Sequence, residues 1–379
     1  MFENTKQFCD SFLELGVPGF DLAVYKGGKC ILRHINGYSD IENKVKMQGN
    51  ERYNIYSCSK LITCTAALQL WEKGAFSLDD KLSDYMPEFA EMTVKTENGI
   101  QKAEKPILIK HLFEMTAGFS RDIASAQIQQ CQEDTHGKCP TRQVMKYLAK
   151  APLVFEPGTR WEYGICHDVL AALVEVVSGE KFECYVKNHI FAVAGMENST
   201  FMLPEEELDT IAAQYNCVNG VRQNIGKKIM SYKLGTEYAS GGAGGISTVD
   251  DYIKFLECLR TGKLLEPETL KLMTTSRLTV EQNQGNWTGH SHGYGLGVRC
   301  PRGVKPYTDF GWGGAAGAFI AVDLENELSL YFGCHIISSR AQGIRSMLYR
   351  FVRADLFDLD DLENIREELK DLYDYHMTY

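Results

Sequence analysis

The 379-residue sequence contains no apolar run long enough to form a membrane-spanning helix, which needs about 18 to 20 such residues. The first residues lack a basic stretch followed by an apolar core, so no secretory signal peptide is predicted. No long basic cluster occurs, and the formal net charge of −10 argues against nucleic acid and anionic membranes as partners. From these absences we expect a cytoplasmic protein that binds neither nucleic acid nor a membrane.

Patterns that bind metals or phosphates are also missing. The twelve cysteines include no C-x-x-C pair, and those in apolar helical stretches are expected to be reduced thiols. The close pair His290 and His292 lies in no H-E-x-x-H motif and has no carboxylate at ligand spacing. The glycine-rich segment 241–245 lacks the G-K-[ST] of a phosphate-binding loop. We therefore expect no metal ion and no organic cofactor.

A G-x-S-x-G elbow is absent as well, which argues against an α/β-hydrolase, but another serine arrangement is present. Ser57 and Lys60 stand three residues apart at the start of an apolar stretch predicted to be helical, so both lie on one helix face. A lysine whose pKa is lowered by burial can take the proton of a serine hydroxyl. At a helix start, the backbone N–H of Ser57 is also free to stabilise an oxyanion. This is the S-x-x-K arrangement of acylating serine enzymes.

The motif is short, and a second copy exists. Ser178 to Lys181 follows an apolar helical run and contains Gly179, so it reads as a helix end and a turn. The alternative for Ser57 is an ordinary helix-start serine beside a solvated lysine. The surrounding sequence must decide between the two interpretations of Ser57.

The surrounding sequence favours the nucleophile. The chain resembles the serine β-lactamase and penicillin-binding-protein-like superfamily, in particular the branch of class C-type β-lactamases and family VIII carboxylesterases. The order and spacing of the matching segments carry the resemblance, which runs through residues 17–19, 37–40, 57–60, 78–82, 111–119, 157–163, 240–248, 293–297 and 311–314. It implies an α+β, β-lactamase/transpeptidase-like fold, in which an antiparallel sheet is flanked by helices and a mostly helical lobe is inserted.

Residue patterns lead to the same architecture. Two pairs of strand-like segments, each pair separated by turn residues, predict β-hairpins. The first pairs residues 20–25 with 29–35, and the second pairs residues 318–323 with 328–333. Pieces from both chain ends would then share one sheet, covered by helices at 57–73, 250–260 and 343–352. We expect an α/β lobe and a mostly helical lobe with the site in the cleft between them; the predicted ranges are 1–85 with 239–379 for the first and 86–238 for the second.

The resemblance assigns two further parts of the site. Tyr163 takes the position of the tyrosine in the family's Tyr-x-Asn element and would relay protons to and from Ser57. Ile165 stands where the asparagine would be, and that asparagine normally helps to hold the side-chain amide of a β-lactam. The departure at Ile165 weakens the case for β-lactamase activity.

The third element is the strand near Trp312, Gly313 and Gly314. In true β-lactamases a lysine opens this element and attracts the substrate carboxylate, whereas an indole carries no positive charge. We therefore expect a pocket for neutral, apolar or aromatic groups, with the two glycines allowing close approach to the backbone. The N–H groups of Ala315 and Ser57 are the expected oxyanion hole.

The sequence thus predicts a serine hydrolase that cleaves carboxylic esters through an acyl-enzyme on Ser57, with Lys60 as base and Tyr163 as relay. The partner would be a small-molecule ester or amide. Alternatives are a β-lactamase or D-alanyl-D-alanine carboxypeptidase, an acyltransferase on the same scaffold, and a non-catalytic scaffold protein. The tail carries an apolar stripe that predicts an amphipathic helix, packed on its own domain or forming a homo-oligomer contact; its residues are Leu362, Ile365, Leu369 and Leu372.

Overall fold

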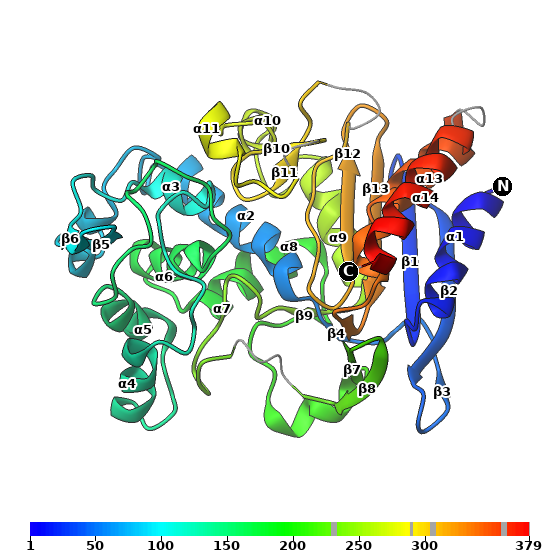
Figure 1. The fold of residues 1–379 in the computed structure, drawn as a ribbon, viewed down its shortest axis with the longest axis horizontal. Helices are drawn as coiled ribbons and strands as arrows, with labels where there is room; N and C mark the ends of the chain where they lie inside the picture. Colours follow the sequence, from blue (N-terminus) through cyan, green and yellow to red (C-terminus); the bar gives the residue numbers. More distant parts are fainter. Residues whose placement is uncertain (229–232, 289–290, 304–307, 358–361, 379) are drawn as a thin grey trace.

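The computed structural model describes residues 1–228, 233–288, 291–303, 308–357 and 362–378. A five-stranded antiparallel sheet with the order β12-β13-β1-β2-β3 forms one side of the molecule (Figure 1). Its strands are β1 (Gly19–Lys26), β2 (Lys29–Asp40), β3 (Val45–Lys46), β12 (Phe319–Asp323) and β13 (Leu328–Cys334). Because β1 pairs with β13, the two ends of the chain share this sheet, as the sequence predicts.

Both predicted hairpins are confirmed. Strands β1 and β2 are joined by Gly27 and Gly28, whose φ angles of 55° and 80° lie in the left-handed region that a tight hairpin turn requires. Strands β12 and β13 pair in register from Phe319 opposite Phe332 to Asp323 opposite Leu328. The sheet therefore follows from local turn chemistry and from side chains that alternate along each strand.

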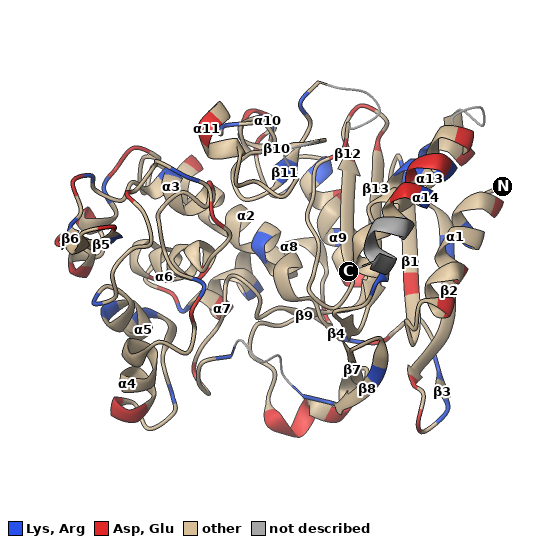
Figure 2. Ribbon diagram, in the orientation of Figure 1, with Lys and Arg blue, Asp and Glu red and all other residues tan. Residues whose placement is uncertain are grey.

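Each face of the sheet packs against its own core, because successive side chains of a strand point to opposite faces. On β1, Phe20 and Leu22 belong to the core covered by helices α1 (Glu3–Glu14) and α13 (Met347–Phe357). Ala23 instead joins the larger core, together with helix α9 (Val249–Arg260), which packs on β13 and β1. In Figure 2, strands β12 and β13 are largely free of charged residues, as a sheet buried on both faces requires.

The other side of the molecule is mostly helical (Figure 1). Helix α2 (Ser59–Glu72) lies between the two sides and is buried almost all round, which is typical of a central helix. It packs on α6 (Cys166–Ser178), which ends at Gly179 in the left-handed conformation, so the second S-x-x-K copy is a helix end, as predicted. The remaining helices here are α3 (Ile109–Phe113), α4 (Ala126–Asp134), α5 (Thr141–Leu148), α7 (Phe182–Val186) and α8 (Ala192–Ala194).

Short strands and helices complete the fold. Two-stranded pairs are formed by β4 (Tyr53–Asn54) with β9 (Ile246–Ser247), β5 (Thr93–Thr96) with β6 (Gly99–Lys102), and β10 (Gly293–Tyr294) with β11 (Arg299–Cys300). A three-stranded sheet contains β14 (Ile336–Ile337), β7 (Gln214–Val218) and β8 (Val221–Gly226). Helices α10 (Pro267–Met273) and α11 (Val280–Asn283) lie above β10 and β11 in Figure 1. The short 3₁₀ helices are η1 (Tyr56–Cys58), η2 (Leu82–Asp84), η3 (Pro87–Phe89) and η5 (Glu205–Thr210), and η4 (Lys187–Phe191) is a short π-helix.

The C-terminal region departs from the prediction at one point. In place of one helix over 343–352, the chain forms α12 (Ala341–Ile344) and α13, separated by a turn at Arg345 and Ser346. The last helix, α14 (Leu362–Thr378), packs on α12 and α13, and its apolar stripe joins the core of α1 and α13; the stripe is Leu362, Ile365, Leu369 and Leu372. The stripe is therefore used within its own chain. No helix in the described ranges is long and apolar enough to cross a membrane.

Candidate active site

Ser57 lies in η1, the single turn that leads into helix α2. The preceding residue, Tyr56, has a φ of 47°, which a non-glycine residue rarely adopts. The hydroxyl of Tyr56 donates to Gln214 Oε1 at 2.6 Å, and Tyr252 donates to the carbonyl oxygen of Cys58 at 2.7 Å. Buried hydrogen bonds on both sides of Ser57 thus hold a strained turn in place, which is common at functional sites.

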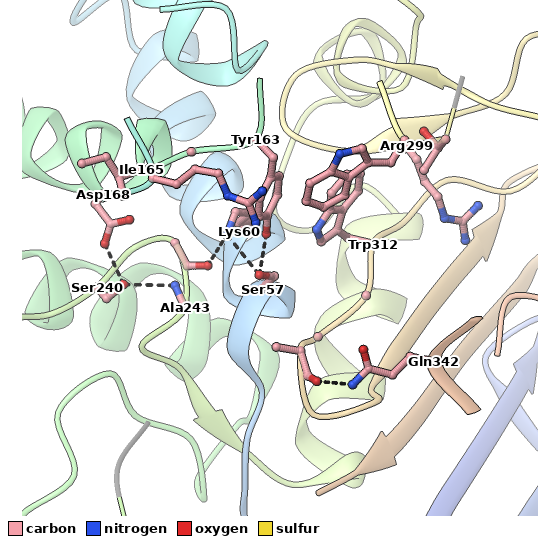
Figure 3. Close-up of a pocket in the computed structure, with 18 of the residues that line it drawn as sticks. Ser57, Lys60, Tyr163, Ile165, Asp168, Ser240, Ala243, Arg299, Trp312 and Gln342 are labelled. Atoms are coloured by element: carbon pink, nitrogen blue, oxygen red, sulfur yellow. Dashed lines mark hydrogen bonds between the residues drawn. The ribbon is translucent and has the colours of Figure 1, made fainter. Parts of the chain in front are cut away.

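Two proton-carrying groups contact the serine hydroxyl (Figure 3). Lys60 Nζ donates to Ser57 Oγ at 3.2 Å and to the carbonyl oxygen of Gly242 at 2.5 Å. The hydroxyl of Tyr163 donates to Ser57 Oγ at 2.5 Å, and Lys60 Nζ lies 4.7 Å from the centre of the Tyr163 ring. The structure therefore brings together the three residues predicted to perform the chemistry, although they come from two distant segments.

The loop that receives Lys60 is held by a buried carboxylate. Asp168 Oδ1 accepts hydrogen bonds from Ser240 at 2.6 Å and from Tyr238 at 2.7 Å, and Ser240 Oγ accepts one from the N–H of Ala243 at 3.1 Å. These bonds fix the segment around Gly242, whose carbonyl receives Lys60. This network was not predicted from the sequence. An acidic residue in the first turn of the apolar helix α6 was the available signal.

The predicted third element forms an edge beside β12. The N–H of Ile320 donates to the carbonyl of Trp312 at 2.9 Å, and that of Gly314 to the carbonyl of Ala318 at 2.8 Å. The chain then turns back at Gly317, which has a φ of 98° and donates to the carbonyl of Gly314 at 3.1 Å. The N–H of Ala315, inside this turn, has no acceptor among the described residues, so it is available to a ligand.

All the site residues predicted from the sequence line one cavity of about 670 Å³. Ile165 lies there as the residue before α6, at the wall formed with Asp168 (Figure 3). Aromatic rings form the other wall. The centres of the Trp312 and Tyr163 rings lie 5.8 Å apart, and the angle between their planes is 16°. The centre of the half-exposed Trp287 ring lies 4.6 Å from that of Tyr163. The predicted residues lining the cavity are Ser57, Lys60, Tyr163, Ile165, Trp312, Gly313, Gly314 and Ala315.

Three arginines also line the cavity, and they were not predicted from the sequence. The Arg121 guanidinium lies 5.6 Å from the ring centre of Tyr163 and 5.3 Å from that of Trp287. Arg299 is paired with the buried Asp309 at 2.5 Å, and Arg345 reaches the strand of Trp312 from the turn after α12. Position 312 carries a tryptophan in place of the lysine found in β-lactamases, but these arginines bring positive charge to the cavity from other parts of the chain.

Metal-binding side chains do not gather within the described ranges, where no group of three His, Cys, Asp or Glu residues is placed to hold an ion. His292 hydrogen-bonds Asp309 at 3.2 Å and Arg299 at 2.8 Å, which places it in the arginine–carboxylate cluster behind the cavity. His290, the other member of the close pair, lies outside the described residues.

Similar proteins cover most of the chain. Protein Rv1367c of Mycobacterium tuberculosis is 26% identical over 355 residues, covering 87% of this chain and 88% of that protein. Esterase EstB of Burkholderia gladioli is 25% identical over 284 residues, covering 69% and 71%. Among solved structures, EstCE1, described as a hydrolase with promiscuous acyltransferase activity, superimposes with a TM-score of 0.77 at 24% identity, covering 93% of this chain and 96% of its own.

The structural likeness confirms the predicted β-lactamase/transpeptidase-like fold, with its antiparallel sheet and inserted helices. The Beta-lactamase family model matches residues 5–345, which include every residue that lines the cavity except Ser346. The chain belongs to the Beta-lactamase family.

Proposed function

We propose that this protein is a serine hydrolase that cleaves carboxylic esters through an acyl-enzyme on Ser57. One observation carries the proposal: Ser57 Oγ, at the wall of a cavity, is contacted by both Lys60 Nζ and the Tyr163 hydroxyl, at 3.2 and 2.5 Å. A nucleophile activated by an adjacent base is the arrangement that covalent acyl transfer needs. A protein that only bound a ligand would not require it.

In the first half-reaction, Ser57 Oγ attacks the ester carbonyl carbon while its proton passes to unprotonated Lys60, the base, with Tyr163 as the proton relay. The carbonyl oxygen becomes an oxyanion, which the N–H groups of Ser57 and Ala315 stabilise. The bond to the alcohol then breaks, and the alcohol leaves with the proton returned by the same pair of residues. In the second half-reaction, water attacks the acyl-enzyme by the same route, and the carboxylic acid is released.

The cavity favours esters with an apolar or aromatic group. Trp312, Trp287 and Ile165 present rings and an alkyl chain to the space beside Ser57. The planar Arg121 guanidinium packs over the rings of Tyr163 and Trp287, so a flat group can be held there by stacking and cation–π contacts. The substrate is a small molecule, and the cytoplasmic location and the absence of nucleic-acid and membrane partners stay predictions from the sequence.

An acyltransferase is the second candidate, in which an alcohol or amine takes the place of water in the second half-reaction. The volume of about 670 Å³ supports it, because a cavity of that size has room for an acceptor beside a small acyl group. EstCE1 is described as having both activities, and the two share every step up to the acyl-enzyme. A β-lactamase or carboxypeptidase is less well supported, since Ile165 and Trp312 replace the residues that hold its substrates.

The test is intact-mass spectrometry of the protein and of Ser57→Ala after incubation with a fluorophosphonate, a p-nitrophenyl ester and a penicillin. We expect the first two to label the wild type and not the variant, with ester turnover and little penicillin adduct. A stable penicillin adduct would point to a penicillin-binding protein, and rapid penicillin hydrolysis to a β-lactamase. Added alcohols or amines that become acylated would identify a transferase, and no adduct or turnover with any reagent would favour a non-catalytic scaffold.

A further inference from the structure

Arg345 connects the turn between α12 and α13 to the strand of the oxyanion hole. Its Nη1 donates a 2.7 Å hydrogen bond to the carbonyl oxygen of Gly314. Its Nη2 occupies the space where a side chain at Gly313 would begin, because a Cβ built there would collide with the guanidinium. Glycine at position 313 therefore makes room for this arginine as well as for a substrate.

The carbonyl that Arg345 holds belongs to the peptide unit that carries the N–H of Ala315. In a trans peptide the C=O and the N–H lie in one plane and point in opposite directions. Fixing the carbonyl of Gly314 thus fixes the direction of the Ala315 N–H. The N–H of Gly317 donates to the same carbonyl oxygen at 3.1 Å, so both of its lone pairs have donors.

The charge on Arg345 adds to this geometric effect. A hydrogen bond from a charged donor is stronger than one from a neutral donor, and successive hydrogen bonds polarise one another. Electron density drawn toward the Gly314 oxygen makes the Ala315 N–H a better donor. Among the described residues no carboxylate forms an ion pair with Arg345, so its charge is not neutralised beside the peptide. Burial lowers the pKa of Arg345, but a guanidinium stays protonated near neutral pH.

We propose that Arg345 is a positioning residue of the reaction: it orients the Gly314–Ala315 peptide and strengthens the Ala315 N–H as an oxyanion donor. The inference rests on the proposed function, because it assigns a role within the same site. It also assigns a role to the break between α12 and α13, which places Arg345 where its side chain can reach Gly314.

Gln342 on α12 provides a matched control. Its Nε2 donates to the carbonyl of Ala315 at 2.5 Å and to that of Ile336 at 3.4 Å. It therefore supports the same turn, but it is neutral and holds the next peptide, whose N–H belongs to Ala316. Loss of Gln342 tests for loosening of the turn, whereas loss of Arg345 also removes the polarisation of the Ala315 N–H.

The experiment compares Arg345→Met, Arg345→Lys and Gln342→Met for turnover of a p-nitrophenyl ester and for binding of phenylboronic acid, whose tetrahedral serine adduct mimics the oxyanion. For Arg345→Met we expect a loss in kcat of about 10- to 100-fold, with KM within about 3-fold and a parallel loss of boronic acid affinity. Arg345→Lys should recover most of the kcat and of the boronic acid affinity, and Gln342→Met should reduce both less than Arg345→Met does. Gly313→Ala, whose Cβ would displace the guanidinium, should also lower kcat and the boronic acid affinity. Unfolding midpoints check that each variant is folded.

Three results would overturn the inference: an Arg345→Met variant with unaltered kcat, a loss in kcat without loss of boronic acid affinity, or no recovery with lysine. Each would mean that Arg345 acts on the fold or on substrate binding alone. A wild type without Ser57-dependent ester turnover would instead contradict the proposed function. The boronic acid affinities would still test Arg345 in that case, because they depend on the tetrahedral adduct and not on turnover.

Discussion

The phenolic hydroxyl of Tyr163 donates a 2.5 Å hydrogen bond to Ser57 Oγ, across 106 positions of sequence. If Tyr163 relays the serine proton, Tyr163→Phe will lower kcat/KM for a p-nitrophenyl ester by about 100- to 10,000-fold, the usual contribution of a general acid–base group. The rate of fluorophosphonate labelling at Ser57 should fall as well. Ester turnover is measured by stopped-flow absorbance, and labelling is measured by intact-mass spectrometry.

Tyr294 offers a control for this change. It is buried beside Trp161 and Trp312, and its hydroxyl has no hydrogen-bond partner among the described residues. Tyr294→Phe should therefore leave kcat/KM within about 2-fold of the wild type, because no hydrogen bond is lost. Equal effects of the two Tyr→Phe changes would contradict a relay role for Tyr163.

Asp168 supports the loop that receives Lys60, so its loss should affect both stability and turnover. Asp168→Ala leaves the buried hydroxyls of Ser240 and Tyr238 without their acceptor, which costs about 1 to 3 kcal/mol for each unsatisfied group. We expect a lower free energy of unfolding in urea and a reduced kcat, as the carbonyl of Gly242 moves away from Lys60. Asp168→Asn keeps one acceptor oxygen and should recover part of both. A variant with lower stability but an unaltered kcat would show that the network supports only the fold.

Trp312 should determine the preference for acyl or alcohol groups. Replacing it with alanine removes the ring that stacks on Tyr163 and opens the cavity wall. For esters with a phenyl group we expect kcat/KM to fall about 10- to 200-fold, the range for a lost apolar contact in a binding pocket. For an ester without an aromatic group, which has less apolar surface to place against the indole, we expect a smaller loss in kcat/KM. The measurement is the ratio of kcat/KM for the phenyl ester to kcat/KM for the other ester, in the wild type and in Trp312→Ala. The same ratio in both proteins would place the binding site for apolar groups elsewhere.

His111 should make the stability of the protein depend on pH. Burial lowers the pKa of its imidazole to about 4, and Nδ1 accepts a hydrogen bond from the N–H of Leu108 at 3.2 Å, which requires the neutral ring. In the unfolded chain a histidine has a pKa of about 6.5, so between about pH 6.5 and pH 4 the unfolded state binds more protons. The stability that His111 contributes is therefore complete above about pH 6.5 and is lost as the pH falls through that window.

The measurement is the free energy of unfolding in urea, at pH 7 and at pH 4.5, of the wild type and of His111→Gln. Relative to the variant, the wild type should lose on the order of 2 kcal/mol between the two pH values. Groups common to both proteins, including the buried His167, cancel in this comparison. A difference that does not change with pH would show that His111 is not held neutral.

The sequence alone determined the features that depend on residues close together in the chain. The Ser57 and Lys60 spacing places both side chains on one face of a turn, and Gly27 with Gly28 forms the turn of the first hairpin. Gly179 ends α6 and removes the second S-x-x-K copy from consideration. These outcomes follow from local sterics and periodicity, which hold whatever the rest of the chain does. The family's fold was accessible too, because the order of its motifs is a property of the sequence. The lobe boundaries at 85/86 and 238/239 stay predictions.

Only the tertiary structure decided which distant side chains complete the site. Asp168 meets Ser240 across 72 positions, and Arg345 meets Gly314 across 31. The Arg121 guanidinium packs over Tyr163, so a strand without its lysine still borders a cavity lined by arginines. No local pattern marks such contacts, since each depends on how helices and strands from separate segments pack and on the directions their side chains then take. The sequence predicted Ser57 as the nucleophile and named its candidate neighbours, and the packing of the two sides of the molecule placed the arginines around them.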